Sequence, residues 1–396
     1  MNIFFVSYFL CINRKRKIRD TKFGIPWQLP FIILTVSMFL SSIFAVAGLA
    51  TEISAFVKYL FENVLLIWVV WETLRTDYDF KFIFKLITVV MFASCIYGLI
   101  EFVIGMNPLQ LYEATLNHDP SKQILFTYGI DERGYRVNSI FEHAIGAGVN
   151  WSLYAGFVLY YIINKKRKLP YHMFAIITAC LCILCVLLTK MRSPLAFAAI
   201  LCFGAFNFKK KRTYFFSLLI IMVLALFLLT MDESSDIFRV IFSMLSLNTT
   251  SSVGGSSFDM RIKQLGVAFN LMKMNPLVGL GTKYQSVISG YLYSDIYGSE
   301  GLLLYVLPSF GIIGLLSYGY YFFFSAIRIP KYFKSKQLAF LFLAYLITWI
   351  FSSLPGMKIS LLYLFAFYLI KSSKKYESST ETRKVAYREG KFKKLF

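Results

Sequence analysis

Runs of apolar residues, each close to the length that crosses a lipid bilayer, recur along almost the whole chain. A helix needs about 20 such residues to span the hydrocarbon core. Hydrophobic residues make up 57% of the 396 residues, and the mean hydropathy is +0.61. We therefore expect an all-α fold: a polytopic transmembrane helix bundle of about 10 to 11 spans, with residues 1–396 forming a single integral membrane domain.

The individual spans follow from the positions of the apolar runs. We expect them near residues 29–49, 54–73, 83–105, 140–163, 169–189, 194–207, 213–231, 299–326, 338–353 and 356–371. Residues 1–12 are also apolar and could form a short first span. This arrangement leaves a first long loop at 106–139 and a larger loop at 232–298, between two late spans.

Basic clusters mark one side of the predicted membrane. They lie after every second crossing, at residues 14–22, 165–168, 209–212, 328–336 and in the tail 371–396. Cytoplasmic loops carry an excess of Lys and Arg, so these segments are expected inside and the loops 106–139 and 232–298 outside. Because the clusters are scattered over separate loops, they form no continuous groove for a phosphate backbone, and we expect no nucleic-acid partner.

Neither a metal site nor another cofactor is expected. The six cysteines all lie within apolar runs, which indicates neither a disulfide framework nor a metal site. The single Asp-x-Asp spacing, at Asp77 and Asp79, falls on the predicted cytoplasmic side.

The short turn in TKMRSPLAF (189–197) places Lys190 and Arg192 on the predicted outer side, where they are not needed as topology signals. Pro194 suits the first position of a helix. Arg192 would then lie at the positive N-terminal end of that helix, and such an end with a guanidinium group is a good anion site. The alternative is an arginine that extends to the outer lipid headgroups.

The first outer loop ends in a second group of ionisable residues. Arg133 and Arg136 precede a predicted helix, and Glu142 and His143 lie near its start. We expect Glu142 and His143 about one turn below the outer surface, where ionisable groups are costly and often functional. His143 could instead form a hydrogen bond to a neighbouring helix. Small residues at 144–148 should allow close helix packing.

The larger outer loop carries a predicted amphipathic helix in FDMRIKQLGVAFNLMKM, which Pro276 ends. Its apolar face would contain Ile262, Leu265, Phe269 and Met272. Arg261 and Lys263 lie in the predicted first turn, where cations oppose the helix dipole, and this placement suggests an anionic partner. Alternatively, the helix lies on the membrane surface with its basic residues on lipid phosphates.

Glu300 stands at the mouth of the next predicted span. Its carboxylate could accept a proton, or it could simply be the boundary residue of a helix N-terminus.

The order of these motifs resembles the O-antigen ligase and polymerase superfamily, which includes the Wzy-type polymerases of bacterial surface polysaccharides. An arginine precedes a span of small residues, K-x-R-S forms a short turn, and an arginine precedes N-P-L-x-G-x-G before a span that opens S-E-x-L-L-x-Y. The resemblance covers roughly residues 130 to 320. Where the ligases typically have a His-Asn pair, this chain has Ser299 and Glu300. This departure favours a polymerase over a ligase.

The resemblance implies an enzyme in the bacterial cytoplasmic membrane whose donor is a glycan on undecaprenyl pyrophosphate. It implies that Arg192, Arg136 and Arg261 stabilise the leaving pyrophosphate, with Lys190, Arg133 and Lys263 helping to bind it. Glu300, or else Glu142 with His143, would activate the acceptor hydroxyl. Flippase and chain-length regulator proteins would be partners. A ligase and a lipid-linked oligosaccharide flippase remain alternatives; the flippase is less favoured because no internal repeat is found.

Overall fold

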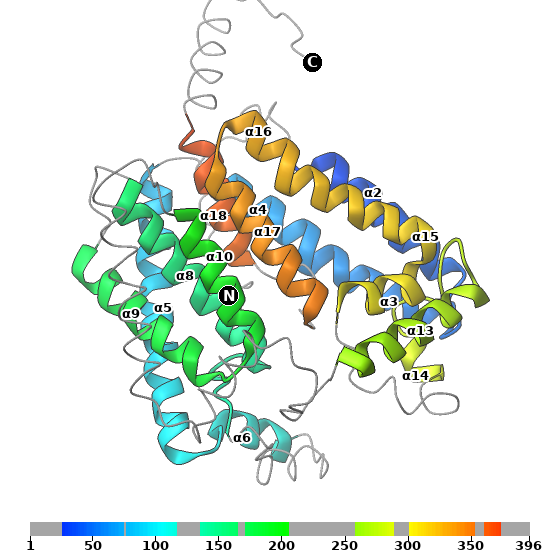
Figure 1. Ribbon diagram of the computed structural model, residues 1–396, viewed down its shortest axis with the longest axis horizontal. Helices are drawn as coiled ribbons and strands as arrows, with labels where there is room; N and C mark the ends of the chain where they lie inside the picture. Colours follow the sequence, from blue (N-terminus) through cyan, green and yellow to red (C-terminus); the bar gives the residue numbers. More distant parts are fainter. Residues whose placement is uncertain are drawn as a thin grey trace, which may run out of the picture.

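The computed structural model describes residues 26–74, 77–116, 135–164, 171–205, 258–288, 301–352 and 360–373. Within these ranges the chain forms helices joined by turns and irregular segments, and it contains no strand. The expected all-α fold is therefore confirmed. Figure 1 shows the helices packed into one bundle, with α13 and α14 at its lower right edge and α6 at its lower left.

The helices are α2 (Gln28–Ile43), α3 (Leu49–Tyr59), the π-helical stretch η1 (Leu60–Leu65), α4 (Leu66–Thr73), α5 (Asp77–Ile104), α6 (Pro108–Leu116), α8 (Ala144–Asn164), α9 (His172–Leu188), α10 (Arg192–Ala205), α13 (Phe258–Met274), α14 (Tyr284–Ile288), α15 (Leu302–Phe323), the π-helical stretch η3 (Phe324–Arg328), α16 (Ile329–Phe333), α17 (Lys336–Phe351) and α18 (Ser360–Lys371). Each predicted span within the described ranges coincides with one helix or with consecutive helices. The predicted span 213–231, residues 1–12 and most of the tail lie outside the described residues.

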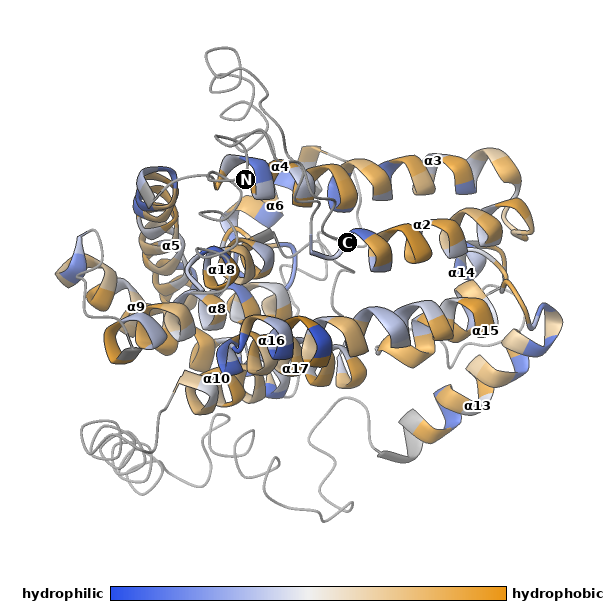
Figure 2. Ribbon diagram, turned by 90° about the horizontal axis from the view of Figure 1, so that it is seen from above, coloured by the Kyte–Doolittle hydropathy of each residue, from blue (hydrophilic) through white to orange (hydrophobic). Residues whose placement is uncertain are grey.

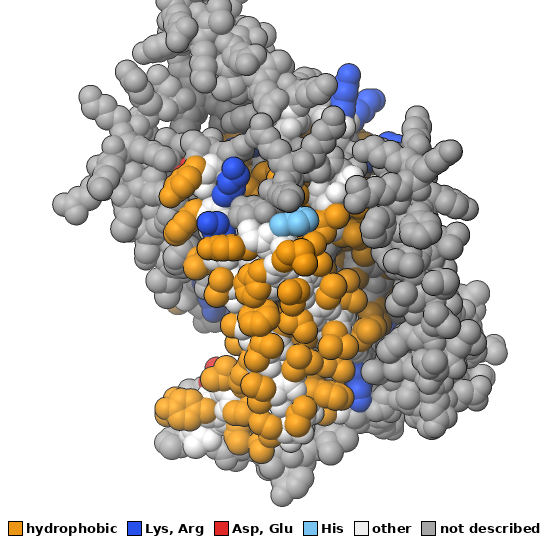
Figure 3. All heavy atoms as spheres, turned by 90° about the vertical axis from the view of Figure 1, so that its left-hand side faces the viewer, with side chains coloured by type: hydrophobic (Ala, Val, Ile, Leu, Met, Phe, Trp, Pro, Cys, Tyr) orange, Lys and Arg blue, Asp and Glu red, His pale blue; other side chains and the backbone are white. Residues whose placement is uncertain are grey.

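Several helical stretches of the described chain have the length and composition of membrane spans. Among the described residues, Leu49–Thr73, Tyr78–Ile104 and Leu302–Phe333 are long and apolar enough to cross a bilayer, and further apolar helices are shorter. Hydrophobic residues cover most of α2, α3 and α15 (Figure 2). Figure 3 shows a broad hydrophobic face on the left-hand side of Figure 1, with basic side chains mainly near its upper end. Such a face suits contact with lipid, and the chain is a multi-pass membrane protein.

α18, the last helix in the described part of the chain, lies at the centre of the bundle. Residues 361–367 are each at most 2% exposed. On one side, Phe365 stacks on Phe157 of α8 with ring centroids 4.1 Å apart. On another side, Tyr363 and Phe367 contact the ring of Trp27. A helix that is apolar all round is expected in the interior, and α18 joins the α8 side of the bundle to the α2 side.

The ends that we predict to be cytoplasmic lie together. The ammonium group of Lys371 donates hydrogen bonds to the carbonyl oxygens of Trp71 (2.7 Å) and Leu74 (2.5 Å), and it lies 4.1 Å from the centre of the Trp71 ring. α16 and the C-terminal end of α18 are at the same end of the bundle (Figure 1). At the opposite end, Val46 N donates to the carbonyl of Leu280.

The sidedness of these two ends can be tested by labelling. We expect Lys334→Cys, in the exposed turn between α16 and α17, to react with a membrane-impermeant thiol reagent only after the cells are opened. Lys273→Cys, exposed on α13, should react in whole cells. Labelling of residue 334 or of residue 210 from outside would contradict the orientation.

Candidate functional site

The turn that carries Lys190 and Arg192 joins α9 to α10. Lys190 has a left-handed backbone (φ 50°) and is largely buried. α10 begins at Arg192, so Pro194 is the third helical residue. The sequence prediction, which placed Pro194 at the first helical position, is therefore wrong by two residues. Proline is tolerated there because the first N–H groups of a helix have no acceptor within it. Arg192 itself opens the helix, which confirms the expected position at its N-terminal end.

Close packing brings α10 against α8. A Cβ atom on Gly148 would lie 2.5 Å from Cβ of Pro194, closer than real contacts allow. The hydroxyl of Ser152 donates to the carbonyl of Pro194 at 3.2 Å. The predicted close packing of the small residues is therefore confirmed at Gly148, and it holds the N-terminus of α10 in place.

The segment 135–143 runs beside this turn and brings Arg136 to it. Nη1 of Arg136 lies 3.6 Å from Sδ of Met191, the residue before Arg192. One residue further, Val137 N donates to the carbonyl of Leu188 at the end of α9. Two loops that are far apart in the sequence thus bring Arg136 and the turn with Lys190 and Arg192 to the same place.

A buried carboxylate in α5 holds the segment around Arg136. Glu101 is fully buried, and its oxygens accept hydrogen bonds from the hydroxyl of Tyr135 (2.8 Å), the amide of Asn138 (2.9 Å) and the amide of Ser139 (2.6 Å). Burial and the bond to Glu101 raise the pKa of Tyr135, so its hydroxyl remains a donor. Sequence analysis missed Glu101. The available signal was a carboxylate near the end of the predicted span 83–105.

Two amide side chains near α6 fix the rest of the segment. Asn107 donates from Nδ2 to the carbonyl of Ser139 (2.8 Å). Gln110 donates from Nε2 to the carbonyls of Phe141 and Glu142, each at 3.2 Å. Residues 135–142 are therefore held against α5 and α6 before α8 begins.

Glu142 and His143 precede the helix, whereas the predicted span 140–163 includes them. α8 begins at Ala144, and both residues are exposed. Nδ1 of His143 accepts a hydrogen bond from the amide of Ile145 at 3.1 Å. This is the arrangement of a helix cap, so His143 bonds to the first turn of its own helix. The preceding residues are held by Gln110, which explains why the helix starts four residues later than predicted.

The outer helix α13 turns a different face inward from the one we predicted. Gln264, Ala268 and Leu271 are buried, whereas Ile262 is 54% and Phe269 45% exposed. α13 packs along α15, and that contact selects the inward face. The helix starts at Phe258, which places Arg261 at the end of the first turn and Lys263, which is exposed, in the second. The side chain of Arg261 lies outside the described part of the structure.

The motif NPLVGLG, residues 275–281, is built into a break in α15. Gly311 has non-helical backbone angles (φ 58°, ψ −152°), which frees backbone groups on both sides of it. The amides of Leu280 and Gly281 donate to the carbonyls of Pro308 and Ser309 (2.8 and 3.1 Å). In return, the amides of residues 312 and 313 donate to the carbonyls of residues 276 and 277. The backbone groups that the break leaves without partners inside α15 are therefore paired with backbone groups of the motif.

A second buried carboxylate holds the end of this loop. Glu52, in α3, is fully buried. It accepts hydrogen bonds from the amide of Thr282 (3.0 Å), the hydroxyl of Thr282 (2.7 Å) and the amide of Lys283 (2.6 Å). Glu52 thus holds the loop at Thr282 by hydrogen bonds in the same way as Glu101 holds the segment around Arg136. Sequence analysis missed Glu52 as well; its signal was a carboxylate close to the outer end of a predicted span.

We call the turn that carries Lys190 and Arg192 the arginine turn. The C-terminal end of α17 connects it with the start of α15. The hydroxyl of Ser193 donates to that of Ser352 at 3.0 Å. A Cβ atom on Gly301, which follows Glu300 in the sequence, would lie 2.7 Å from the carbonyl oxygen of Ile350. Glu300 and Arg133 themselves lie outside the described residues.

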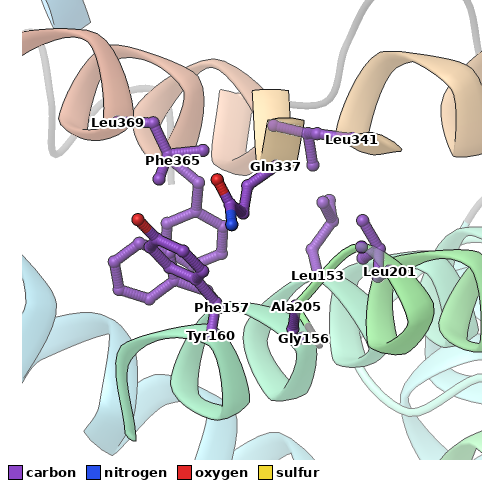
Figure 4. Close-up of a pocket in the computed structure, with 11 residues that line it drawn as sticks. Leu153, Gly156, Phe157, Tyr160, Leu201, Ala205, Gln337, Leu341, Phe365 and Leu369 are labelled. Atoms are coloured by element: carbon purple, nitrogen blue, oxygen red, sulfur yellow. The ribbon is translucent and has the colours of Figure 1, made fainter. Parts of the chain in front are cut away.

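A cavity of about 30 Å³ lies elsewhere, between α8, α10, α17 and α18. Figure 4 shows its lining, which is apolar apart from the amide of Gln337 and the hydroxyl of Tyr160. This volume suits a water molecule or two and not a sugar. None of the sequence-predicted site residues lines it, so we place the candidate site at the arginine turn.

Comparison with known families gives a match to one part of the chain. Residues 177–319 match the family model described as O-antigen ligase. This part of the chain is an O-antigen ligase family domain. Members of that family are glycan ligases and polymerases that act on surface polysaccharides. A comparison with curated proteins finds no match.

The O-antigen ligase domain contains some of the candidate residues and not others. Lys190, Arg192, Arg261, Lys263 and Glu300 fall within it. Arg133, Arg136, Glu142 and His143 precede it, as do both buried carboxylates. The family domain therefore supplies the turn and the motif loop, while residues from outside the domain hold both in place.

Proposed function

We propose that the protein is a polymerase that joins oligosaccharide repeat units carried on undecaprenyl pyrophosphate, at the outer face of the bacterial cytoplasmic membrane. The observation that carries this proposal is the contact of Arg136 with Met191, the residue directly before Arg192 at the N-terminus of α10. Displacement at the anomeric carbon releases a pyrophosphate, whose negative charge grows in the transition state. Positive groups fixed in advance near that charge lower the barrier.

Each cation has a distinct part in this proposal. Arg192 offers a planar guanidinium that can bind two phosphate oxygens at once, at the positive end of the α10 helix dipole. Arg136 reaches the same turn from the first outer loop. Lys190, Arg133 and Lys263 add positive charge for binding, and Arg261 contacts the pyrophosphate from α13.

The acceptor hydroxyl needs a base. Glu300 is the first candidate, and Glu142 with His143 is the second. Gly301, which follows Glu300, packs on the end of α17 that also contacts Ser193, and this arrangement supports Glu300. Glu142 and His143 are exposed at the start of α8, where a soluble sugar end could reach them.

A ligase is the second candidate function, because the matching family model carries that description. A ligase would transfer finished glycan to a lipid or protein acceptor. The pair Ser299 and Glu300, in the place where ligases typically have His-Asn, favours the polymerase.

The lipid-linked glycan that accumulates without the protein distinguishes the candidates. In a deletion strain we expect single repeat units on the lipid carrier at the outer leaflet and no long chains, with long chains restored by the wild-type gene. Long polymer that stays on the carrier would indicate a ligase instead. Single units trapped on the inner leaflet would indicate a flippase. Sizing and locating the lipid-linked glycan decides among these outcomes.

A further inference from the structure

Glu101 occupies an unfavourable place for a carboxylate. It lies in the last turn of α5, where the helix dipole disfavours a negative charge, and it is fully buried. A protein keeps such a group when it does something that an apolar residue cannot do. The carboxylate accepts hydrogen bonds from three donors of the segment 135–139, two of which are backbone amides.

These donors lie on both sides of Arg136 in the sequence. Tyr135 precedes it, and Asn138 and Ser139 follow it. Ser139 has a left-handed backbone (φ 55°), and its hydroxyl donates to the carbonyl of Ser94 in α5 at 2.6 Å, which fixes the chain after Arg136. With the segment held against α5 before and after Arg136, Nη1 of its guanidinium lies 3.6 Å from Sδ of Met191.

We infer that Glu101 is a positioning residue for Arg136, acting through the main chain of residues 135–139 and without touching the substrate. This inference rests on the proposed function, because it assigns Glu101 to the pyrophosphate site. A displacement of about 1 Å at a catalytic group can cost 10²-fold in rate. Glu101 therefore sets how well Arg136 can meet a phosphate oxygen. If Glu101 served only general stability, its loss would weaken the protein whether or not Arg136 were present.

Affinity for inorganic pyrophosphate tests this inference. The full-length protein in lipid nanodiscs would be titrated calorimetrically as wild type, Arg136→Ala, Glu101→Gln and the double variant. Glutamine has nearly the same shape, but it presents an N–H₂ group to a donor and so breaks the arrangement. We expect each single variant to bind about tenfold or more weakly, and the double variant to bind as weakly as Arg136→Ala, within about twofold.

Two further variants sharpen the result. Glu52→Gln is a matched control: the carboxylate is equally buried and accepts three similar hydrogen bonds, but it holds the loop at Thr282. Glu52→Gln should act independently of Arg136. Any fold-loss of pyrophosphate affinity that it causes should therefore multiply with the fold-loss caused by Arg136→Ala. Tyr135→Phe removes one hydrogen bond to Glu101 and keeps the carboxylate, so it remains informative if Glu101→Gln does not fold. We expect it to weaken binding about twofold to tenfold, and only when Arg136 is present.

The possible outcomes separate this inference from the proposed function. If wild-type protein does not bind pyrophosphate, the proposed leaving-group site is wrong and the inference fails with it. If Arg136→Ala weakens binding while Glu101→Gln and Tyr135→Phe leave it unchanged, the proposed function stands and the inference is overturned. The inference would also be overturned if the losses of pyrophosphate affinity caused by Glu101→Gln and Arg136→Ala multiplied in the double variant.

Discussion

Arg192→Lys is expected to reduce the rate of polymerisation nearly as much as Arg192→Ala, by roughly 10² to 10³. Lysine keeps the charge but loses the planar fork that meets two phosphate oxygens. The half-buried Arg192 side chain at the start of α10, next to a turn that Arg136 also reaches, makes this geometry demanding. The measurement is polymer length on gels, together with the amount of inserted protein by immunoblot.

An arginine that only reaches lipid headgroups would behave differently. Lysine reaches them equally well, so Arg192→Lys would then be active, and Arg192→Ala would mainly lower the amount of protein. Lys273→Ala, which removes an exposed cation from α13, serves as the control and should keep normal polymer. Full-length polymer from normally expressed Arg192→Ala would remove Arg192 from the site.

Gly279→Ala is expected to remove most of the folded protein. Gly279 has φ +74°, a conformation that costs an L-residue about 1–2 kcal/mol. The new Cβ would also lie 2.4 Å from the backbone carbonyl of Ser309, and overpacking of this kind typically costs about 1–3 kcal/mol. The backbone at Ser309 cannot move aside as a side chain can, because its carbonyl accepts a hydrogen bond from Gly281. That bond is one of those between the motif loop and α15 that bridge the break at Gly311.

The matched control is Gly266→Ala, in the same outer region. A Cβ atom at Gly266 meets nothing within 4 Å, and the residue lies within helix α13. Alanine there should be neutral or stabilising by up to about 1 kcal/mol. The amount of monodisperse protein after stepwise heating, followed by size-exclusion chromatography, compares the two. Equal heat resistance of both variants would show that the motif loop is not held as described.

The membrane-spanning helices could be predicted from the sequence because their signal is local. A run of apolar residues of sufficient length must become a helix in the bilayer, whatever its neighbours are, and α5, α9 and α17 lie where such runs predicted them. The start of α8 was predicted too early, because the carbonyls of Phe141 and Glu142 accept hydrogen bonds from Gln110, in a distant segment. The apolar sequence of α18 predicts an interior helix, but it does not predict which helices α18 contacts.

For the candidate site, sequence determined the chemistry and tertiary structure decided the arrangement. The N-terminal position of Arg192 could be predicted because proline and a short turn are local features of a helix start. The approach of Arg136 to Met191, the hydrogen bonds of Glu52 and Glu101, and the inward face of α13 all depend on contacts between distant segments. A buried carboxylate is stable only where specific donors surround it, and a helix face is buried only where a partner covers it. Both conditions arise from packing, so the structure alone could decide them.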